Sequence, residues 1–88
     1  MYQVLVSATF QKQFDKLPLD VRKRIRKGLN ELEKDPIDPR PGADIKQLKD
    51  TDPPKHRLRI GEYRVIYLVE KNKVKVIEVF IRSRGYRE

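Results

Sequence analysis

The sequence predicts an α+β fold with the element order β-α-α-β-β-β, in which a hairpin of two helices covers one face of a small, mainly antiparallel sheet. Apolar residues recur with a helical period as far as residue 35, and from residue 55 onward they alternate as in half-buried strands. A proline-rich stretch separates the two regions. With 88 residues, the chain is expected to form one small domain, residues 1–88.

The N-terminal segment predicts a strand followed by a short helix. The run YQVLVS at 2–7 contains β-branched residues, and Ser7 or Thr9 has a side chain of the kind that caps a helix. Pro18 separates this helix from the next one. The short helix carries its apolar residues on one face: Phe10, Phe14 and Leu17.

A second, longer helix is predicted from Asp20 to the Asp35-Pro36 step, because proline disfavours the helical conformation of the residue before it. Gly28 costs roughly 1 kcal/mol of helix stability relative to alanine, so we expect it to let a neighbouring element pack closely. A very short link joins the two helices, which should form an antiparallel hairpin. The apolar face of the second helix consists of Val21, Ile25, Leu29 and Leu32, with Gly28 on the same side.

Residues 36–54 contain five of the six prolines and are predicted to form a loop. Within the segment IKQLK at 45–49, Ile45 and Leu48 are expected to anchor this loop to the core. The rest of the chain predicts three strands, at about 55–60, 63–70 and 74–81.

The turn Gly61-Glu62 fixes the pairing of the first two of these strands. A glycine at the first of two loop positions suits a type II′ hairpin, which places Arg59 opposite Arg64. Directly paired residues share a sheet face, so the basic residues gather on one face. That face receives Lys55, Arg57, Arg59 and Arg64. The other face, which the helices can cover, receives His56, Leu58, Val65, Tyr67 and Val69.

The turn before the last strand decides where that strand's residues point. A two-residue turn would turn Ile77, Val79 and Ile81 toward the basic face, so burial favours a three-residue turn at 71–73. The three-residue turn pairs Glu70 with Val74, Tyr67 with Ile77, Val65 with Val79, Arg64 with Phe80 and Tyr63 with Ile81. The basic face, which we call the arginine face, then comprises Lys55, Arg57, Arg59, Arg64 and Arg82, with Ile66, Glu78 and Phe80 among them.

Charge is the most pronounced property of the chain. The 21 Lys and Arg against 13 Asp and Glu give a net charge of +8, which favours a polyanionic partner, either nucleic acid or an acidic protein segment. The direct opposition of Arg59 and Arg64 is destabilising and indicates an anion site. The alternatives are a surface lattice of ion pairs and a solvated sheet face.

The C-terminal tail RSRGYRE adds Arg84, Tyr86 and Arg87 to this positive charge. Arginine beside aromatic residues suits single-stranded RNA, whose phosphates bind cations and whose bases stack on rings. The alternative is a frayed basic terminus.

The composition predicts no metal site and no cofactor, because the chain has no cysteine and a single histidine, His56. No apolar run approaches the roughly 18 residues of a membrane span, and the N-terminus lacks the pattern of a signal peptide. These features favour a cytoplasmic protein.

The element order and two motifs resemble the RelE toxins of the RelE/ParE superfamily. The motifs are LRIGEYRVIY at 58–67 and VIEVFIRSRGY at 76–86, preceded by Lys46-Gln47-Leu48 in the loop. The resemblance implies a microbial-ribonuclease-like fold and a toxin that cuts mRNA in the ribosomal A site. It also implies a cognate protein antitoxin that holds the toxin inactive.

The resemblance assigns the catalytic positions to the arginine face and the tail. Arg64 matches the central arginine of the family, and Arg82 matches the arginine that closes the last strand. Lys55 and Arg57 match two basic positions, both usually lysine. Tyr86 matches the C-terminal tyrosine, although its spacing from Arg82 is shorter here. Arg59, Arg84, Arg87 and Phe80 are the expected RNA- or ribosome-binding residues.

The implied reaction is attack of a 2′-OH on the adjacent phosphorus, without a metal. Arg64 and Arg82 would stabilise the developing charge. A guanidinium retains its proton, so either Lys55 accepts the proton, or Arg57 acts mainly by its charge and the ribosome supplies the geometry. Glu78 could be a carboxylate base, and its other expected role is to orient an arginine. Tyr86 is the candidate acid or stacking platform. His56 is expected on the core face, away from this chemistry.

Two other functions remain open from the sequence. The ParE branch of the superfamily shares the fold, lacks the basic catalytic set and poisons DNA gyrase. An inactive relative that only binds RNA or an antitoxin is the third hypothesis, supported by Arg57 at a position that is usually lysine.

Overall fold

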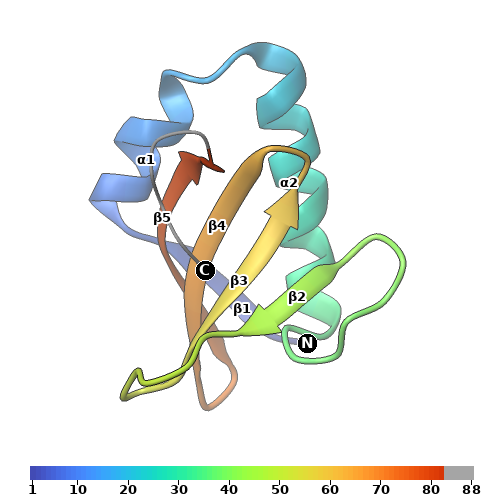
Figure 1. Cartoon of the computed structure of the whole chain (residues 1–88), viewed down its shortest axis with the longest axis vertical. Helices are drawn as coiled ribbons and strands as arrows, with labels where there is room; N and C mark the ends of the chain where they lie inside the picture. Colours follow the sequence, from blue (N-terminus) through green and yellow to red (C-terminus); the bar gives the residue numbers. More distant parts are fainter. Residues whose placement is uncertain (83–88) are drawn as a thin grey trace.

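Two helices and five strands make up the computed structural model, which describes residues 1–82 (Figure 1). The elements are β1 Gln3–Val6, α1 Ala8–Asp15, α2 Leu19–Lys34, β2 Asp44–Gln47, β3 Lys55–Ile60, β4 Tyr63–Glu70 and β5 Lys73–Ile81. The strands form one sheet in the order β1-β5-β4-β3-β2, in which β1 runs parallel to β5 and the other neighbours are antiparallel. The α+β fold and its mainly antiparallel sheet are therefore as predicted.

Ser7 connects the first helix to the sheet. Its hydroxyl oxygen accepts a hydrogen bond from the Phe10 N–H at 2.9 Å and so caps α1, which resolves the choice between Ser7 and Thr9. The same hydroxyl donates to the Ile77 carbonyl of β5 at 2.6 Å. One side chain therefore fixes both where α1 begins and where it lies against the last strand.

The helices form the predicted antiparallel hairpin: Figure 1 shows α1 rising to the Pro18 turn and α2 descending from it. The helix α2 ends at Lys34, and Asp35 adopts the extended conformation expected before Pro36. The Tyr67 hydroxyl donates to the Pro36 carbonyl at 2.7 Å, which ties the chain after α2 to the centre of the sheet. Burial raises the pKa of Tyr67, so this hydroxyl keeps its proton.

The core lies between the helix hairpin and one face of the sheet. The residue Gly28 is buried in α2, and a Cβ there would come within 2.9 Å of Ile60 Cδ1 and 3.0 Å of Leu58 Cδ2. The close approach predicted for this glycine is therefore present. The core residues contributed by the helices are Phe10, Phe14, Val21, Ile25 and Leu32, and those of β3, β4 and β5 include Leu58, Val65, Tyr67, Val74, Val76 and Val79.

The strand β2 departs from the prediction of a loop for this segment. Ile45 is buried and Leu48 half-buried, so both anchor the segment as expected. In addition, the backbone of Asp44–Gln47 pairs antiparallel with β3, which places Asp44 opposite Arg59. Four residues among prolines give too weak an alternation to indicate a strand, and β3 supplies the hydrogen-bonding edge that makes it one.

The predicted turn between the last two strands was wrong, and a β-bulge corrects its effect. The turn has two residues, Lys71 and Asn72, so Glu70 pairs with Lys73 and Tyr67 with Val76. The register then shifts between Ile66 and Tyr67. Beyond this bulge, the predicted pairs of Val65 with Val79, Arg64 with Phe80 and Tyr63 with Ile81 are all present, whereas those of Glu70 with Val74 and Tyr67 with Ile77 are not.

The sequence contains a signal for the bulge. Val74 and Val76 are two residues apart, whereas Val76 and Val79 are three apart, yet all three are buried in the core. A regular strand cannot bury this set on one face, so an extra residue must be accommodated at Ile77. The bulge satisfies both halves of the strand.

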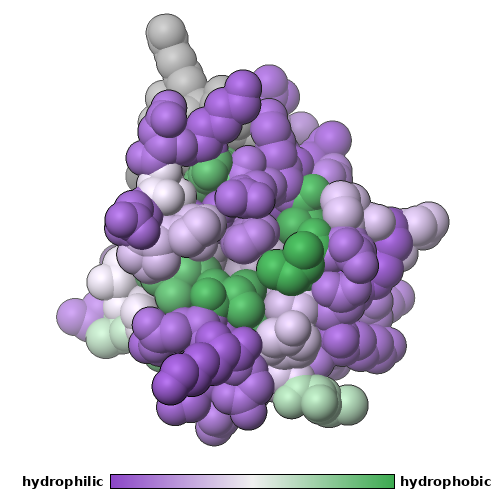
Figure 2. Space-filling model, turned by 90° about the horizontal axis from the view of Figure 1, so that it is seen from below, coloured by the Kyte–Doolittle hydropathy of each residue, from purple (hydrophilic) through white to green (hydrophobic). Residues whose placement is uncertain are grey.

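Charged and polar side chains cover most of one face of the molecule (Figure 2). Figure 2 shows the molecule from below, with hydrophilic residues over most of this face and hydrophobic ones gathered in a central strip. Neither helix of residues 1–82 combines the length and the apolar character needed to cross a membrane.

Candidate functional site

The β3–β4 hairpin builds the centre of the arginine face. Gly61 has φ of 58°, and no other residue of this turn has a positive φ, which fits the predicted type II′ geometry. The turn pairs Ile60 with Tyr63, Arg59 with Arg64 and Arg57 with Ile66, as predicted. The basic residues of the two strands therefore share one face, opposite the helices.

Two of these arginines are buried. Arg57 is 7% exposed and Arg64 is 4% exposed, whereas Lys55 is half-buried and Arg59 is exposed. Removing a guanidinium from water is costly unless polar or charged groups surround it. The burial of two such groups on the same sheet face therefore distinguishes this face from an ordinary solvated one.

The turn itself accommodates the opposed pair of arginines. Arg64 Nη1 donates to the Gly61 carbonyl at 3.0 Å and to the Tyr63 carbonyl at 3.2 Å. Arg59 Nε donates to the same Gly61 carbonyl at 3.4 Å. The opposition of Arg59 and Arg64 is thus compensated in part within the protein, which sequence analysis did not foresee.

The strand β2 adds two residues to this face that were not predicted there: Asp44, opposite Arg59, and Lys46, opposite Arg57. The Asp44 carboxylate lies 3.2 Å from Arg57 Nη2 and 3.6 Å from Arg59 Nη1. The Asp44 side chain is 52% exposed, so solvent screens these ion pairs. The alternation of Asp44, Ile45 and Lys46 is the only sequence signal for its place, and it is too short to predict a strand.

The last strand adds Glu78 and Phe80 to the face. Phe80 lies opposite Arg64 and Glu78 opposite Ile66, and both side chains are half-buried. Arg82 follows directly after β5, is exposed, and its N–H donates to the Glu62 carbonyl at 2.8 Å. Three further predicted site residues, Arg84, Tyr86 and Arg87, lie outside the described residues.

His56 lies on the core face, as predicted. Its ring stacks on Tyr67 with centroids 5.3 Å apart, and it is 6% exposed. Burial lowers the pKa of His56, and within residues 1–82 its Nδ1 has no hydrogen-bond partner. The imidazole is therefore a neutral part of the core and does not face the arginines.

The lowered pKa of His56 predicts a pH-dependent stability. The unfolded chain binds a proton at this histidine near pH 6.5, and the folded chain binds it only at lower pH. The free energy of unfolding should therefore fall as the pH drops below 6.5, by at most about 1.4 kcal/mol per pH unit. Thermal unfolding measured between pH 7.5 and 5.5 tests this.

His56→Phe is the matched control for that measurement. It keeps a ring against Tyr67 and removes the titration, so its unfolding midpoint should change little across the same range. Glu31, Asp35 and Glu70 have pKa values lowered by hydrogen bonds and neighbouring cations, so they remain ionised throughout. An equal pH dependence in both proteins would contradict the assignment.

The arrangement offers cations for an anionic ligand. Among residues 1–82, no three His, Asp or Glu side chains come together in a way that could hold a metal ion. The arginine face is formed by residues of β2, β3, β4 and β5. These residues include more cations than carboxylates. Phosphate and carboxylate groups are the anions whose geometry a guanidinium matches with two parallel hydrogen bonds.

A family model and several solved structures are similar to this chain. The model of the ParE toxin of type II toxin–antitoxin systems matches residues 4–86. No curated protein matches. The archaeal RelE–RelB complex from Pyrococcus horikoshii OT3 is similar with a TM-score of 0.81 and 30% identity, over 96% of this chain and 98% of that chain.

Two other RelB–RelE complexes are similar over nearly the whole chain. That of Methanococcus jannaschii has a TM-score of 0.73 and 26% identity, covering 90% of this chain and 91% of that chain. The intact complex of E. coli has a TM-score of 0.66 and 26% identity, covering 99% of this chain and 100% of that chain. The helix hairpin on a mixed sheet is thus a RelE-like fold.

Proposed function

This chain belongs to the family of ParE toxins of type II toxin–antitoxin systems, within the RelE/ParE superfamily, and we propose that it is a ribonuclease toxin because of its arginine face. It cuts mRNA in the ribosomal A site and so stops translation in the cytoplasm. The observation that carries this proposal is the pair of buried guanidinium groups, Arg57 and Arg64, at the centre of the arginine face.

Buried guanidinium groups suit this chemistry because they are fixed before the substrate binds. Arg64 is held by two turn carbonyls and Arg57 by Asp44, so neither must reorganise as charge develops on a phosphate. Arg59 and Lys55 surround them at more accessible positions. A preformed cationic site of this kind favours the transition state more than the ground state.

The proposed reaction is a transesterification within the RNA strand. The 2′-oxygen forms a bond to the adjacent phosphorus while the bond from phosphorus to the 5′-oxygen breaks. The products are a 2′,3′-cyclic phosphate and a free 5′-OH. Arg64 and Arg82 stabilise the charge on the phosphorane, and Arg57 contributes by its charge.

Lys55 accepts the proton of the 2′-OH, and Tyr86 is the proposed donor to the leaving 5′-oxygen. The backbone N–H of Lys55 donates to Thr51 Oγ1 at 2.8 Å, which holds the start of β3 in place. Glu78 is the alternative acceptor, because it is half-buried on the same face. Each proton-transfer step is expected to contribute about 10²–10⁴-fold to the rate.

A protein antitoxin is the proposed partner. The similar structures from P. horikoshii, M. jannaschii and E. coli are complexes of a RelE toxin with RelB. We expect the antitoxin of this chain to cover the arginine face with acidic or amphipathic segments, since a net positive face attracts them.

Mapping of transcript 5′ ends after induction of the toxin tests the proposal. We expect new ends within the codons of translated messages and none in the same messages when their start codon is removed. The second candidate, gyrase poisoning, is favoured by the match to the ParE model. Intact mRNA together with gyrase-linked DNA breaks would support that candidate and refute the ribonuclease.

A further inference from the structure

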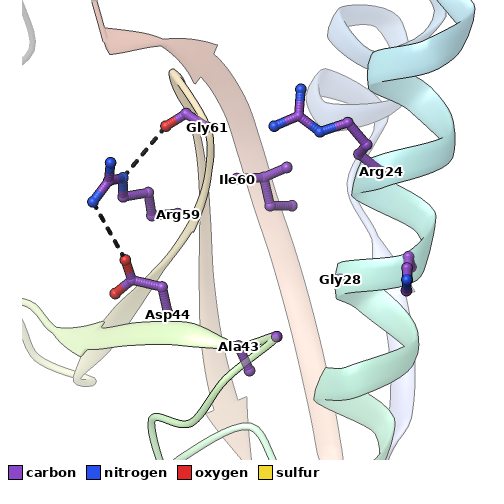
Figure 3. Close-up of a pocket in the computed structure, with 9 residues that line it drawn as sticks. Arg24, Gly28, Ala43, Asp44, Arg59, Ile60 and Gly61 are labelled. Carbon is purple, nitrogen blue, oxygen red and sulfur yellow. Dashed lines mark hydrogen bonds and ion pairs between the residues drawn. The ribbon is translucent and has the colours of Figure 1, made fainter.

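A hollow lies beside the end of β3, between that strand, the start of β2 and the helix α2. It has a volume of about 300 Å³. Figure 3 shows Arg24 extending from α2 toward the end of β3, and Arg59 on the other side of that strand, paired with Asp44. We call this hollow the Gly61 pocket; it is lined by Arg24, Lys27, Gly28, Gly42, Ala43, Asp44, Arg59, Ile60 and Gly61.

Three guanidinium groups converge on Gly61. Arg59 Nε and Arg64 Nη1 both donate to its carbonyl, at 3.4 and 3.0 Å. From the other side, Arg24 Nη2 lies 2.5 Å from the position that a Cβ of residue 61 would occupy. A side chain at this position would therefore require the end of the Arg24 side chain to move.

The two cations of α2 that line the pocket, Arg24 and Lys27, have no counter-ion among residues 1–82. Arg24 and Lys27 are exposed, and within residues 1–82 neither forms an ion pair or a side-chain hydrogen bond. They belong to a run of five cations over residues 22–27 without an acid. Like charges three and four residues apart destabilise a helix, so an external anion would relieve this repulsion.

The size and lining of the Gly61 pocket favour a phosphate over a protein segment. Three cations and three glycines make up most of its lining, and Ile60 and Ala43 are its apolar residues. Its one carboxylate, Asp44, is paired with Arg57 and Arg59. A protein segment would need a larger apolar surface to bury. Arg59 lines this pocket and also shares the Asp44 carboxylate with Arg57, so the pocket and the arginine face form one continuous basic surface.

We propose that the Gly61 pocket is a phosphate-binding subsite that holds the RNA backbone beside the arginine face. The inference rests on the proposed action on RNA. Arg24 and Lys27 bind a phosphate together with Arg59, and this extends the path of the RNA from the sheet face around the end of β3 to α2. The phosphate belongs either to the mRNA strand or to ribosomal RNA.

The test is the double variant Arg24→Gln/Lys27→Gln, with Lys34→Gln/Lys49→Gln as the control. Both pairs remove two exposed charges, and neither control residue lines the pocket. Binding is measured by fluorescence anisotropy with a labelled 2′-O-methyl oligonucleotide, which resists 2′-OH attack, at several salt concentrations. Co-sedimentation with mRNA-free ribosomes is measured in parallel.

We expect the pocket variant to bind one of these two RNAs about tenfold more weakly. The slope of the logarithm of the binding constant against the logarithm of the salt concentration should become shallower by about 0.7 for each phosphate that the variant no longer neutralises. Weaker binding of the oligonucleotide assigns the phosphate to mRNA, and weaker binding of ribosomes alone assigns it to ribosomal RNA. The control pair should bind each RNA within about twofold of the unmodified protein.

Equal weakening by the two pairs would show a diffuse field only and overturn the subsite. Unchanged binding of both RNAs by the pocket variant would also overturn the subsite. Binding to poly-glutamate serves as the probe for an acidic protein segment, and a loss of that binding alone would overturn the subsite as well. The readout does not depend on cleavage. If mRNA is never cut but the pocket variant still loses RNA affinity, the subsite stands and the ribonuclease proposal fails.

Discussion

Arg64→Ala should reduce mRNA cutting about 10²–10³-fold, because it removes a fixed donor from the site where phosphorane charge develops. The loss should appear in the rate of cutting on programmed ribosomes more than in ribosome affinity, since the group acts mainly in the transition state. In cells, the same variant should no longer arrest growth. Single-turnover cleavage of a ribosome-bound message is the measurement.

Arg64 is buried, so its replacement also tests the fold. The carbonyls of Gly61 and Tyr63 lose a donor, and some stability is lost with it.

Arg82→Ala is the second variant, because Arg82 is exposed and its removal should leave the unfolding midpoint unchanged while cutting falls strongly. Lys75→Ala is the matched control: it removes an exposed cation that pairs with Glu70 on the surface. Folded Arg64→Ala and Arg82→Ala proteins that cut as fast as the control would refute the catalytic assignment.

Leu58→Ala should destabilise the protein by about 3–5 kcal/mol, near the upper end for such truncations. Leu58 is 1% exposed, and the element that covers it presents Gly28, which has no side chain that could relax into the cavity. Small domains have only about 5–15 kcal/mol of stability in total, so a large share would be lost. Urea unfolding at pH 7.5 measures the change.

Gly28→Ala provides the matched test of this explanation. In the unmodified protein the added Cβ would meet Ile60 Cδ1 at 2.9 Å and Leu58 Cδ2 at 3.0 Å. Leu58→Ala removes the second contact and leaves space into which the Ile60 side chain can move. Alanine there also favours the helix, so the second substitution should recover about 1 kcal/mol that it does not provide alone. Strict additivity of the two changes would show that the cavity beneath α2 is not the cause.

The hairpin was predictable because its information is local. Gly61 at the first loop position selects the turn, and the turn alone determines that Arg59 faces Arg64, without a contribution from any other element. Alternation then separates Leu58 from the arginines, and it places His56 in the core. The apolar faces of the two helices follow from a period that extends over several turns, which is equally robust.

The register of the last strand was only half predictable. The pairs next to the turn at Lys71 and Asn72 and the pairs beyond the bulge differ in register by one residue. A prediction that assumes one regular strand must therefore assign the wrong partners to one half of β5. The bulge at Ile77 also receives the hydroxyl of Ser7 from the other end of the chain. Its position therefore depends on how β1 and α1 dock onto β5.

The sequence by itself determined the element order apart from β2, the core, and the set of arginines that share a sheet face, because turn chemistry and periodicity act between residues close in the chain. Only the tertiary structure decided that Arg57 and Arg64 are buried, that Asp44 joins Arg57 and Arg59, and that Arg24 reaches Gly61. These features join segments that are far apart in sequence. Burial and ion pairing depend on which surfaces pack together, and no local pattern encodes that choice.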